Sequence, residues 1–327
     1  MKLTPLICYT DKGLYCQEAD IYIDPHRKVS KALITHGHSD HARAGHKEYL
    51  CSAPSELILQ QRLGKNRNIT GIPFGETILI NGVKFSFHPA GHIAGSAQIR
   101  VELKGEIWVI SGDYKTENDG LIEPFELVPC HHFITECTFG LPVYRWENQR
   151  IVFQDINQWW QQNIQSGTTS VLIAYSLGKA QRLVKNVNSE LGPIFCYYTI
   201  HEMNQVYRTL GYDLPDTELI DESLTKEELK NALLITPHAS KESPWLEEAE
   251  SVSIASASGW LMTKKGRRRL AGHKGFVLSD HCDWYGLIDV IKNTGAENIY
   301  PTHGPSDILS HYLNEEGFNA TPIESVR

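Results

Sequence analysis

The densest group of potential metal ligands in the sequence is the segment Thr35-His36-Gly37-His38-Ser39-Asp40-His41. Neutral imidazoles and carboxylates are the ligands that borderline divalent ions such as zinc accept. Gly37 allows the backbone to turn sharply, so that neighbouring side chains can reach one point. Four ligands within six residues would crowd a single tetrahedral ion. The segment therefore predicts a site for two metal ions.

Three further segments could complete this site. His92 stands among small residues in AGHIAGSA, Asp113 closes SGD, and His303 lies in PTHG near the end of the chain. Each of them follows a predicted strand, as His36 does, and an aspartate at a strand end can bridge two cations. A lone histidine is more often structural, but beside the first segment we expect these three residues to join the same site.

Short strands and turns must position these ligands in the first half of the chain. β-Branched and aromatic runs bounded by Gly, Pro, Asp or Asn predict strands at 19–23, 32–35, 83–87, 98–103 and 106–111. Lys104-Gly105 predicts a two-residue hairpin turn between the last two of these strands.

The pattern changes near residue 150 to alternating helices and strands. We expect a helix at 151–165, a strand at 169–174 and a helix at 177–187, followed after Gly275 by a strand, a helix and a strand at 276–279, 284–292 and 298–302. This alternation is typical of parallel strands joined by crossover helices, in a layer distinct from the first half.

Composition excludes several classes of protein. With 327 residues, of which 41% are hydrophobic and 21% charged, the chain can form a large core. The net charge of −8 argues against a protein that coats nucleic acid, although a local basic patch, Lys264 to Arg269, remains compatible with an enzyme acting on a polyanion. No apolar run approaches the ~20 residues of a membrane span, and Asp11 interrupts the first residues before a signal-peptide core could form. The seven scattered cysteines contain no CxxC pair, so we expect reduced thiols and a cytoplasmic protein.

The HxHxDH, AGH and SGD motifs and the late histidine together resemble the metallo-β-lactamase fold, an αββα sandwich with its metals at one edge of two sheets. Two more segments, TECTFG at 135–140 and SDHCDW at 279–284, resemble the additional motifs of the β-CASP nucleases, which carry an inserted α/β domain between them. The resemblance implies a first part of the sandwich at 1–142, a β-CASP cap at 143–272 and the return of the sandwich at 273–327.

The whole chain resembles the bacterial ligase-associated DNA exonucleases, a group also described as messenger-RNA 3′-end processing factors. The segments that carry this likeness are IDP at 23–25, FGLP at 139–142, YRW at 144–146, LGKAQR at 177–182 and SGW at 258–260. Cys137 departs from the family pattern, which usually has Ser or Thr at this position.

The resemblance also implies a role for each site residue. One metal ion would be held by His36, His38 and His92, and the other by Asp40, His41 and His303, with Asp113 bridging the two. Zinc is the metal expected, with manganese as the alternative. His281 would act as general acid and Glu136 would orient it, while Asp40 would also take a proton from the attacking water.

Basic residues are the expected contacts to substrate. Lys179 follows a predicted strand and lies near a helix start, where a phosphate could bind. The basic patch lies between SGW and SDHCDW, and it would contact the nucleic-acid backbone through Lys264, Lys265, Arg267, Arg268 and Arg269.

The function expected from this resemblance is a metal-dependent phosphodiesterase, a DNA exonuclease in repair. An RNA-processing β-CASP ribonuclease is the alternative, and His303 favours it because the RNA-cleaving branches carry a histidine there. A catalytically silent scaffold subunit would have lost ligands, whereas here every expected position is occupied. The resemblance implies DNA as the preferred partner, with an ATP-dependent DNA ligase and a helicase encoded nearby.

Overall fold

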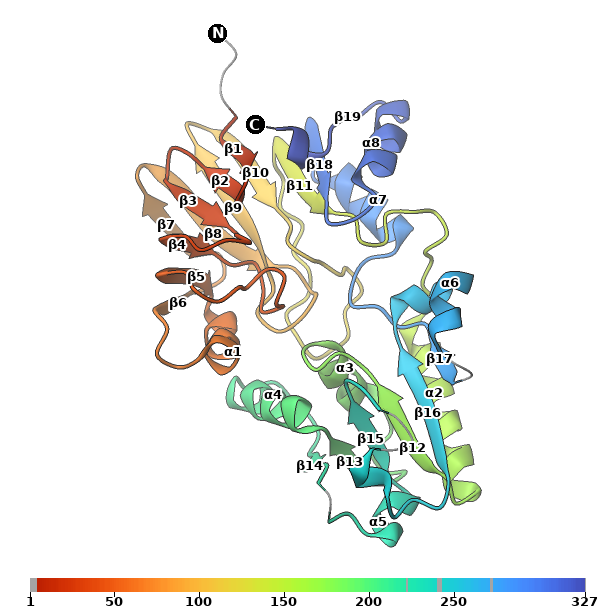
Figure 1. Cartoon of the computed structure of the whole chain (residues 1–327). Helices are drawn as coiled ribbons and strands as arrows, with labels where there is room; N and C mark the ends of the chain where they lie inside the picture. Colours follow the sequence, from red (N-terminus) through yellow and green to blue (C-terminus); the bar gives the residue numbers. More distant parts are fainter. Residues whose placement is uncertain (1–4, 222, 240–242, 271–272, 327) are drawn as a thin grey trace. The chain divides into compact units, whose positions relative to one another are not determined.

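The computed structural model describes residues 5–221, 223–239, 243–270 and 273–326 (Figure 1). The chain divides into two compact units. Unit 1 contains the residues up to Pro142 and those from His281 onward, and unit 2 contains Val143–Asp280. Unit 2 is therefore inserted into the sequence of unit 1.

The first sheet of unit 1 has the strand order β1-β2-β3-β4-β5-β6. Its strands are β1 (Ile7–Thr10), β2 (Gly13–Cys16), β3 (Ile21–Ile23), β4 (Lys31–Leu33), β5 (Glu48–Ser52) and β6 (Ile69–Ile72). β1 to β3 are antiparallel, and β3 to β6 run parallel. Helix α1 (Ala53–Leu63) follows β5 and covers the outer face of this sheet, where Leu59 packs with Tyr49 and Ala32.

The second sheet of unit 1 has the order β19-β18-β11-β10-β9-β8-β7. Its strands are β7 (Thr77–Ile80), β8 (Val83–Pro89), β9 (Ala97–Leu103), β10 (Glu106–Ile110), β11 (His132–Glu136), β18 (Asn298–Thr302) and β19 (Asn319–Ala320). The predicted hairpin at Lys104-Gly105 is confirmed: both residues have positive φ, as a two-residue hairpin turn requires.

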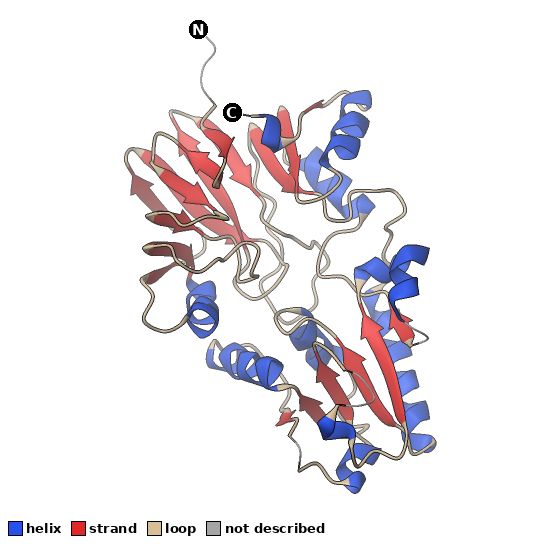
Figure 2. Ribbon diagram, in the orientation of Figure 1, coloured by secondary structure: helices blue, strands red, loops and turns tan. Residues whose placement is uncertain are grey.

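Three hydrophobic layers hold the described part of unit 1 together, one between the sheets and one on the outer face of each, because successive side chains of a strand point to opposite faces. Trp108 and Ile110 of β10 face the first sheet and pack with Ile21 and Leu33, whereas Val109 faces outward. On that outer side, Val109 belongs to a cluster with residues of α7 (Trp284–Asn293) and α8 (Ser306–Glu315). Unit 1 is thus an αββα sandwich, as the sequence predicted (Figure 2). A short 3₁₀ turn, η4 (Ile323–Ser325), follows β19.

Unit 2 contains a parallel sheet with the order β14-β13-β15-β12-β16-β17. The strands are β12 (Thr169–Ile173), β13 (Ile194–Cys196), β14 (Glu218–Leu219), β15 (Leu233–Thr236), β16 (Val252–Ala257) and β17 (Lys274–Phe276). The helices are α2 (Gln149–Gln165), α3 (Lys179–Asn186), α4 (Tyr198–Thr209), α5 (Lys226–Lys230) and α6 (Lys264–Arg267), with 3₁₀ turns η1 (Pro244–Leu246), η2 (Gly259–Met262) and η3 (Arg268–Leu270). The expected parallel layer with crossover helices is confirmed. No helix in the described part of the chain combines the length and apolar character that a membrane span requires.

A buried ion cluster lies at the end of unit 2. The carboxylate of Asp280 pairs with Lys179 Nζ at 3.0 Å and with Arg182 Nη1 at 3.3 Å. All three side chains are almost fully buried. Removing one partner of a buried ion pair leaves an uncompensated charge, which costs far more than the pair itself contributes.

We therefore expect Asp280→Asn to lower the free energy of unfolding by about 3–5 kcal/mol, measured as a lower midpoint of urea unfolding at unchanged slope. Asp213→Asn is a matched control, because Asp213 pairs with Lys185 at 2.6 Å but is exposed. That change should cost less than about 1 kcal/mol. Equal losses in the two variants would contradict the structural role of the buried cluster.

Candidate metal centre

Strand ends bring the candidate ligands together at one edge of unit 1. β10, β11 and β18 are parallel, and β8 runs in the same direction because β9 is antiparallel to both β8 and β10. Their carboxyl ends therefore share an edge, and they lead directly to His92, Asp113, Glu136 and His303. The segment that follows β4 in the first sheet carries the remaining ligands, from His36 to His41.

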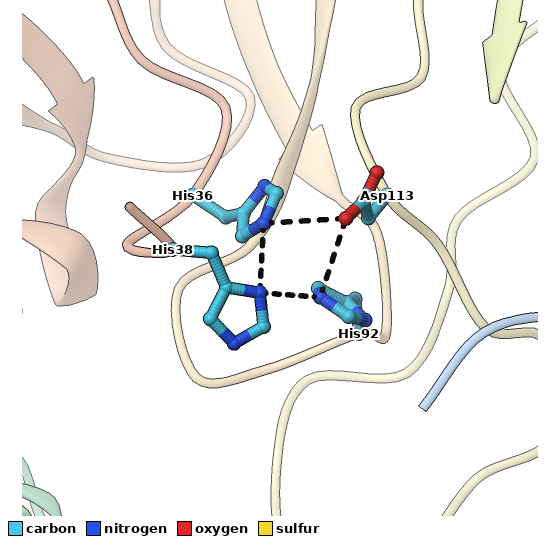
Figure 3. Close-up of side chains that lie close together, drawn as sticks. All are labelled: His36, His38, His92 and Asp113. Atoms are coloured by element: carbon cyan, nitrogen blue, oxygen red, sulfur yellow. Dashed lines mark hydrogen bonds and ion pairs between the residues drawn. The ribbon is translucent and has the colours of Figure 1, made fainter. Parts of the chain in front are cut away.

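The first group consists of His36, His38, His92 and Asp113 (Figure 3). His38 Nδ1 lies 3.1 Å from the Nε2 atoms of both His36 and His92. Asp113 Oδ2 lies 3.5 Å from His36 Nε2 and 3.7 Å from His92 Nε2. Ligands about 2.0–2.1 Å from a tetrahedral zinc ion are themselves roughly 3.4 Å apart. The four atoms therefore have the spacing of one tetrahedral metal site.

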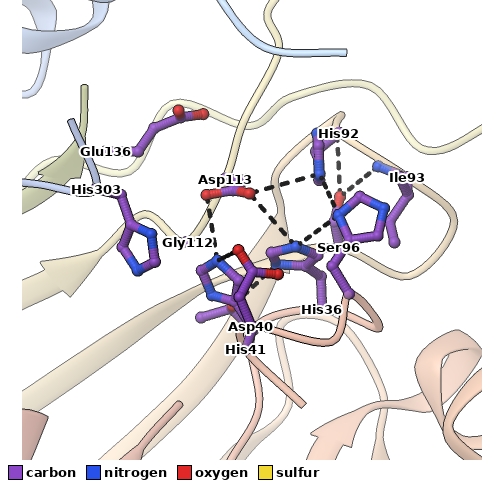
Figure 4. A network of polar contacts seen from close by, with 12 residues as sticks. His36, Asp40, His41, His92, Ile93, Ser96, Gly112, Asp113, Glu136 and His303 are labelled. Atoms are coloured by element: carbon purple, nitrogen blue, oxygen red, sulfur yellow. Dashed lines mark hydrogen bonds and ion pairs between the residues drawn. The ribbon is translucent and has the colours of Figure 1, made fainter. Parts of the chain in front are cut away.

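The second group consists of Asp40, His41 and His303, whose ligand atoms lie within 4.8 Å of one another. His41 Nε2 is 3.8 Å from Asp40 Oδ2, and the rings of His41 and His303 stack at 4.6 Å. Asp113 links the two groups, because its Oδ1 atom lies 3.5 Å from His41 Nε2 while Oδ2 faces the first group (Figure 4).

Two buried atoms at this link indicate that a cation belongs here. Apart from their approach to each other at 3.5 Å, neither His41 Nε2 nor Asp113 Oδ1 has a hydrogen-bond partner among the described residues, although both are buried. Leaving such atoms unpaired costs free energy, and a divalent ion between them would remove that cost. The donor set of imidazoles and carboxylates thus fits one metal ion in each group, with Asp113 between them.

The pKa values of the buried ligands follow from their surroundings. Burial lowers the pKa of His36 well below its ordinary value, which keeps this imidazole neutral, as a metal ligand must be. Burial also disfavours a proton on His41, but the carboxylates of Asp113 and Asp24 raise the pKa of His41 well above its ordinary value. Carboxylates that attract a proton this strongly also attract a divalent cation.

Asp24 orients one of the candidate ligands, although no role for it was expected from the sequence. Its Oδ2 atom accepts a hydrogen bond from His41 Nδ1 at 2.7 Å, so that Nε2 of the same ring faces Asp113. Asp24 also accepts bonds from the backbone N–H and the hydroxyl of Thr35. Carboxylate–histidine pairs of this kind fix the ring and raise the basicity of a ligand. The only signal in the sequence was its place in the IDP segment at 23–25.

Glu136 and His281 lie together, although 145 residues separate them. His281 Nδ1 is 2.9 Å from both carboxylate oxygens of Glu136, and Glu136 Oε1 also accepts a bond from the backbone N–H of Tyr114. The His281 ring lies 4.6 Å from that of His92. Together with Asp113, Glu136 and His281 form a third group of side chains that could hold a metal ion. A cavity of about 190 Å³ reaches Asp40, His41, Glu136 and His303 within unit 1.

Backbone geometry at the end of β18 places His303. This residue has φ 54°, a left-handed conformation that non-glycine residues adopt only under constraint. A Cβ atom on the next residue, Gly304, would lie 2.1 Å from the carbonyl oxygen of Cys137. Cys137 is buried and donates from Sγ to the Thr302 carbonyl at 3.1 Å, and burial raises its pKa to about 12. The cysteine therefore ties β11 to β18 beside the site and is not a reactive thiolate.

The predicted substrate contacts all belong to unit 2. Lys179 is 4% exposed and its ammonium pairs with Asp280, so a phosphate contact would require this pair to open. The side chains of Lys264, Lys265, Arg267 and Arg268 are exposed on α6 and the turn that follows it. The side chain of Arg269 lies outside the described part of the chain.

Comparison with known proteins identifies several relatives. A probable DNA ligase from Opitutus terrae is 30% identical over 314 residues, which are 95% of this chain and 30% of that protein. The endoribonuclease YSH1 of Eremothecium gossypii is 30% identical over 118 residues, covering 36% of this chain and 15% of the relative. The cleavage and polyadenylation specificity factor subunit 3-I of Arabidopsis thaliana is 28% identical over 196 residues, or 50% of this chain and 28% of the relative. The chain thus spans less than a third of the length of each of these relatives.

A solved structure supports the fold. A protein of unknown function from Enterococcus faecalis superposes with a TM-score of 0.62 at 11% identity, covering 89% of this chain and 78% of that one. No protein-family model matches the chain.

We expect purified protein to carry close to two metal ions per chain, because the ligands form two groups joined by Asp113. Asp113→Ala should lose most of both ions, since it removes a ligand from each group at once. Elemental analysis of dialysed protein measures this directly. Protein that contains no metal, and binds none when metal is added, would contradict the two-metal site.

We expect Asp24→Asn to weaken metal affinity by about 10–100-fold, because it removes the carboxylate that orients His41. Titration against a chromogenic chelator measures the affinity. Asp20→Asn is a control on the same strand-rich segment, because Asp20 is exposed and its carboxylate accepts a hydrogen bond from the Tyr15 hydroxyl, away from the candidate ligands. Unchanged affinity in Asp24→Asn would show that His41 needs no such support.

Proposed function

The chain belongs to the β-CASP family of metallo-β-lactamase-fold proteins, and from that premise we propose that it is a metal-dependent phosphodiesterase that cleaves nucleic acid. The observation that carries this proposal is the bridging position of Asp113, next to the Glu136–His281 pair. Two bound divalent ions would lower the pKa of a shared water and stabilise charge on both oxygens of an in-line displacement at phosphorus. We propose zinc as the metal, because imidazoles dominate the ligand set and its spacing is tetrahedral.

The protein's own groups would then move the protons. Asp40 is exposed at the cavity, where its carboxylate would accept a proton from the attacking water. His281 would donate a proton to the leaving oxygen from Nε2, because Nδ1 faces the carboxylate of Glu136. That carboxylate fixes the orientation of the ring. In this arrangement Asp40 would serve both as a metal ligand and as a base, whereas Glu136 and His281 would serve proton transfer alone.

We propose DNA as the substrate and exonucleolytic repair as the role. Support comes from the relative named as a DNA ligase, whose likeness extends over 95% of this chain, whereas the endoribonuclease matches 36%. The same relative supports a DNA ligase as a functional partner. A helicase partner rests on the sequence resemblance alone. RNA processing is the second candidate, because two of the relatives are named as an endoribonuclease and as a subunit of a polyadenylation factor.

The substrate is tested with end-labelled DNA and RNA, each single- and double-stranded, incubated with the protein and either Zn²⁺ or Mn²⁺. Progressive shortening of DNA from one end, with RNA left intact, supports the proposal. Cleavage of RNA alone would replace it with the second candidate. If the metal-loaded protein cleaves none of these DNA and RNA substrates, the assignment as a nuclease is wrong.

Substitution of His281 should impair acid catalysis, whereas substitution of His303 should impair metal binding. We expect His281→Ala to retain its metal and to lose roughly 10²–10⁴-fold in turnover on DNA. The loss should be much smaller for a nitrophenyl phosphodiester, whose leaving group needs no proton. His303→Ala should weaken metal binding and impair both substrates alike, because it belongs to the second ligand group.

The two variants are compared by their metal content and by their turnover on DNA and on the nitrophenyl phosphodiester. Glu136→Gln serves as the matched variant: it keeps the shape of the side chain and should behave as a weaker form of His281→Ala. If His281→Ala loses metal as His303→Ala does, His281 is a ligand, which its position near Asp113 would also permit.

A further inference from the structure

An aromatic ring follows the carboxyl end of each of four neighbouring strands in unit 2. Tyr197 and Tyr198 follow β13, His238 follows β15, Tyr175 follows β12, and Trp260 follows β16. These parallel strands are neighbours in that order, so their carboxyl ends form one edge of the sheet (Figure 1). Adjacent strands lie about 4.8 Å apart, and the row of rings therefore extends over roughly 15 Å.

The rings in this row are unusually exposed. Tyr175 is 63% exposed, Tyr198 is 52% exposed and Trp260 is 42% exposed. Tyr197 joins them, since its ring contacts Tyr198 at 4.8 Å and meets His238 nearly edge-on at 5.2 Å. Single exposed aromatic residues are normal on a protein surface, but several along one sheet edge mark a surface that binds something apolar and flat.

Buried hydrogen bonds hold the loops that carry these rings. The amide of Gln181, which is fully buried, accepts a bond from the Gly178 N–H and donates to the Ser176 carbonyl and to Asn204 of α4. The hydroxyls of Ser176 and Thr199 are 2.9 Å apart and connect the loop after β12 to the start of α4. Because Tyr175 and Tyr198 adjoin these residues, little conformational entropy remains to be lost when a ligand binds them.

Positive charge accompanies the row. α3 and α4 both begin at this edge, and the positive end of a helix dipole favours anions such as phosphate. Lys179 Nζ lies 5.3 Å from the centroid of the Tyr175 ring and supports that ring, while its charge is paired with Asp280. The exposed side chains of Lys264 and Lys265 follow η2, which contains Trp260. Aromatic faces combined with cationic groups are the features by which proteins bind unpaired nucleic-acid strands.

We propose that Tyr175, Tyr197, Tyr198 and Trp260 form a stacking platform for the unpaired bases of a single strand. The carboxyl edge of a parallel sheet is also where α/β domains usually bind their ligands. The proposal rests on the proposed function and adds to it a preference for single strands, because the bases of a duplex are already stacked on one another. It assigns this recognition to residues that the sequence analysis did not select.

The test measures binding, so that it is independent of cleavage. The full metal-loaded chain carrying His281→Ala is titrated by fluorescence anisotropy with three labelled probes: an oligothymidylate, an abasic strand of the same length, and a duplex. The first and second probes have equal charge and differ only in their bases. Tyr175→Leu and Tyr198→Leu remove a ring, and Tyr175→Phe and Tyr198→Phe are matched controls that keep it.

We expect the unchanged platform to bind the oligothymidylate more tightly than the abasic strand. Each leucine variant should weaken oligothymidylate binding by about 5–100-fold, which corresponds to the loss of one stacked base. Binding of the abasic strand should not change, and the phenylalanine variants should bind all probes as the parent does.

Two results would overturn the proposal. If the leucine variants bind the oligothymidylate as tightly as the parent, or lose affinity for the abasic strand equally, the rings do not stack on bases, while the proposed function stands. If the parent chain binds none of the three probes, both the platform and the proposed function are wrong.

Discussion

A single buried carboxylate, that of Asp113, determines the organisation of unit 1. One oxygen faces the imidazoles of His36 and His92 and the other faces His41, so the side chain belongs to both ligand groups. Such a concentration of polar atoms in a protein interior is costly unless charges of opposite sign compensate it. The parallel course of β8, β10, β11 and β18 provides the necessary convergence, because their ends deliver ligands to the same edge. The hydrophobic layers between and outside the two sheets keep these ends in place.

The features of the fold that depend on neighbouring residues could be predicted from the sequence. The turn at Lys104-Gly105 follows from residues that accept positive φ, and the helix and strand alternation near residue 170 from short-range periodicity. The exact ends of the helices and strands were harder to predict from the sequence. A strand was predicted at 276–279, but β17 ends at Phe276 and the chain then passes from unit 2 to unit 1 after Asp280. The buried pairing of Asp280 with Lys179 and Arg182, far away in sequence, defines this segment, and local pattern carries no signal for it.

The residues of the candidate site likewise divide into those that the sequence identified and those that it did not. The ligands from His36 to His41 are evident because they are adjacent in sequence, and Asp113 could be selected from its place after a strand. The pairing of Glu136 with His281 came from resemblance, since nothing in their local sequence connects them. Asp24 was missed because its role depends on a contact with His41 across the fold. Lys179 was selected for its charge and helix position, yet its side chain points into a buried ion pair, a distinction that requires three-dimensional structure.

The two ligand groups differ in their access to solvent, and this difference has a kinetic consequence. His36, His92 and Asp113 are buried and His38 is partly buried, whereas Asp40 and His303 are exposed. A competing chelator or water molecule can approach an ion at the second group without disturbing the core, but an ion at the first group is released only when the surrounding loops open. From the proposed two-metal protein, metal should therefore leave in two phases, a fast one and a slow one. The protein would spend part of its life as a singly loaded species whose lifetime is set by loop opening.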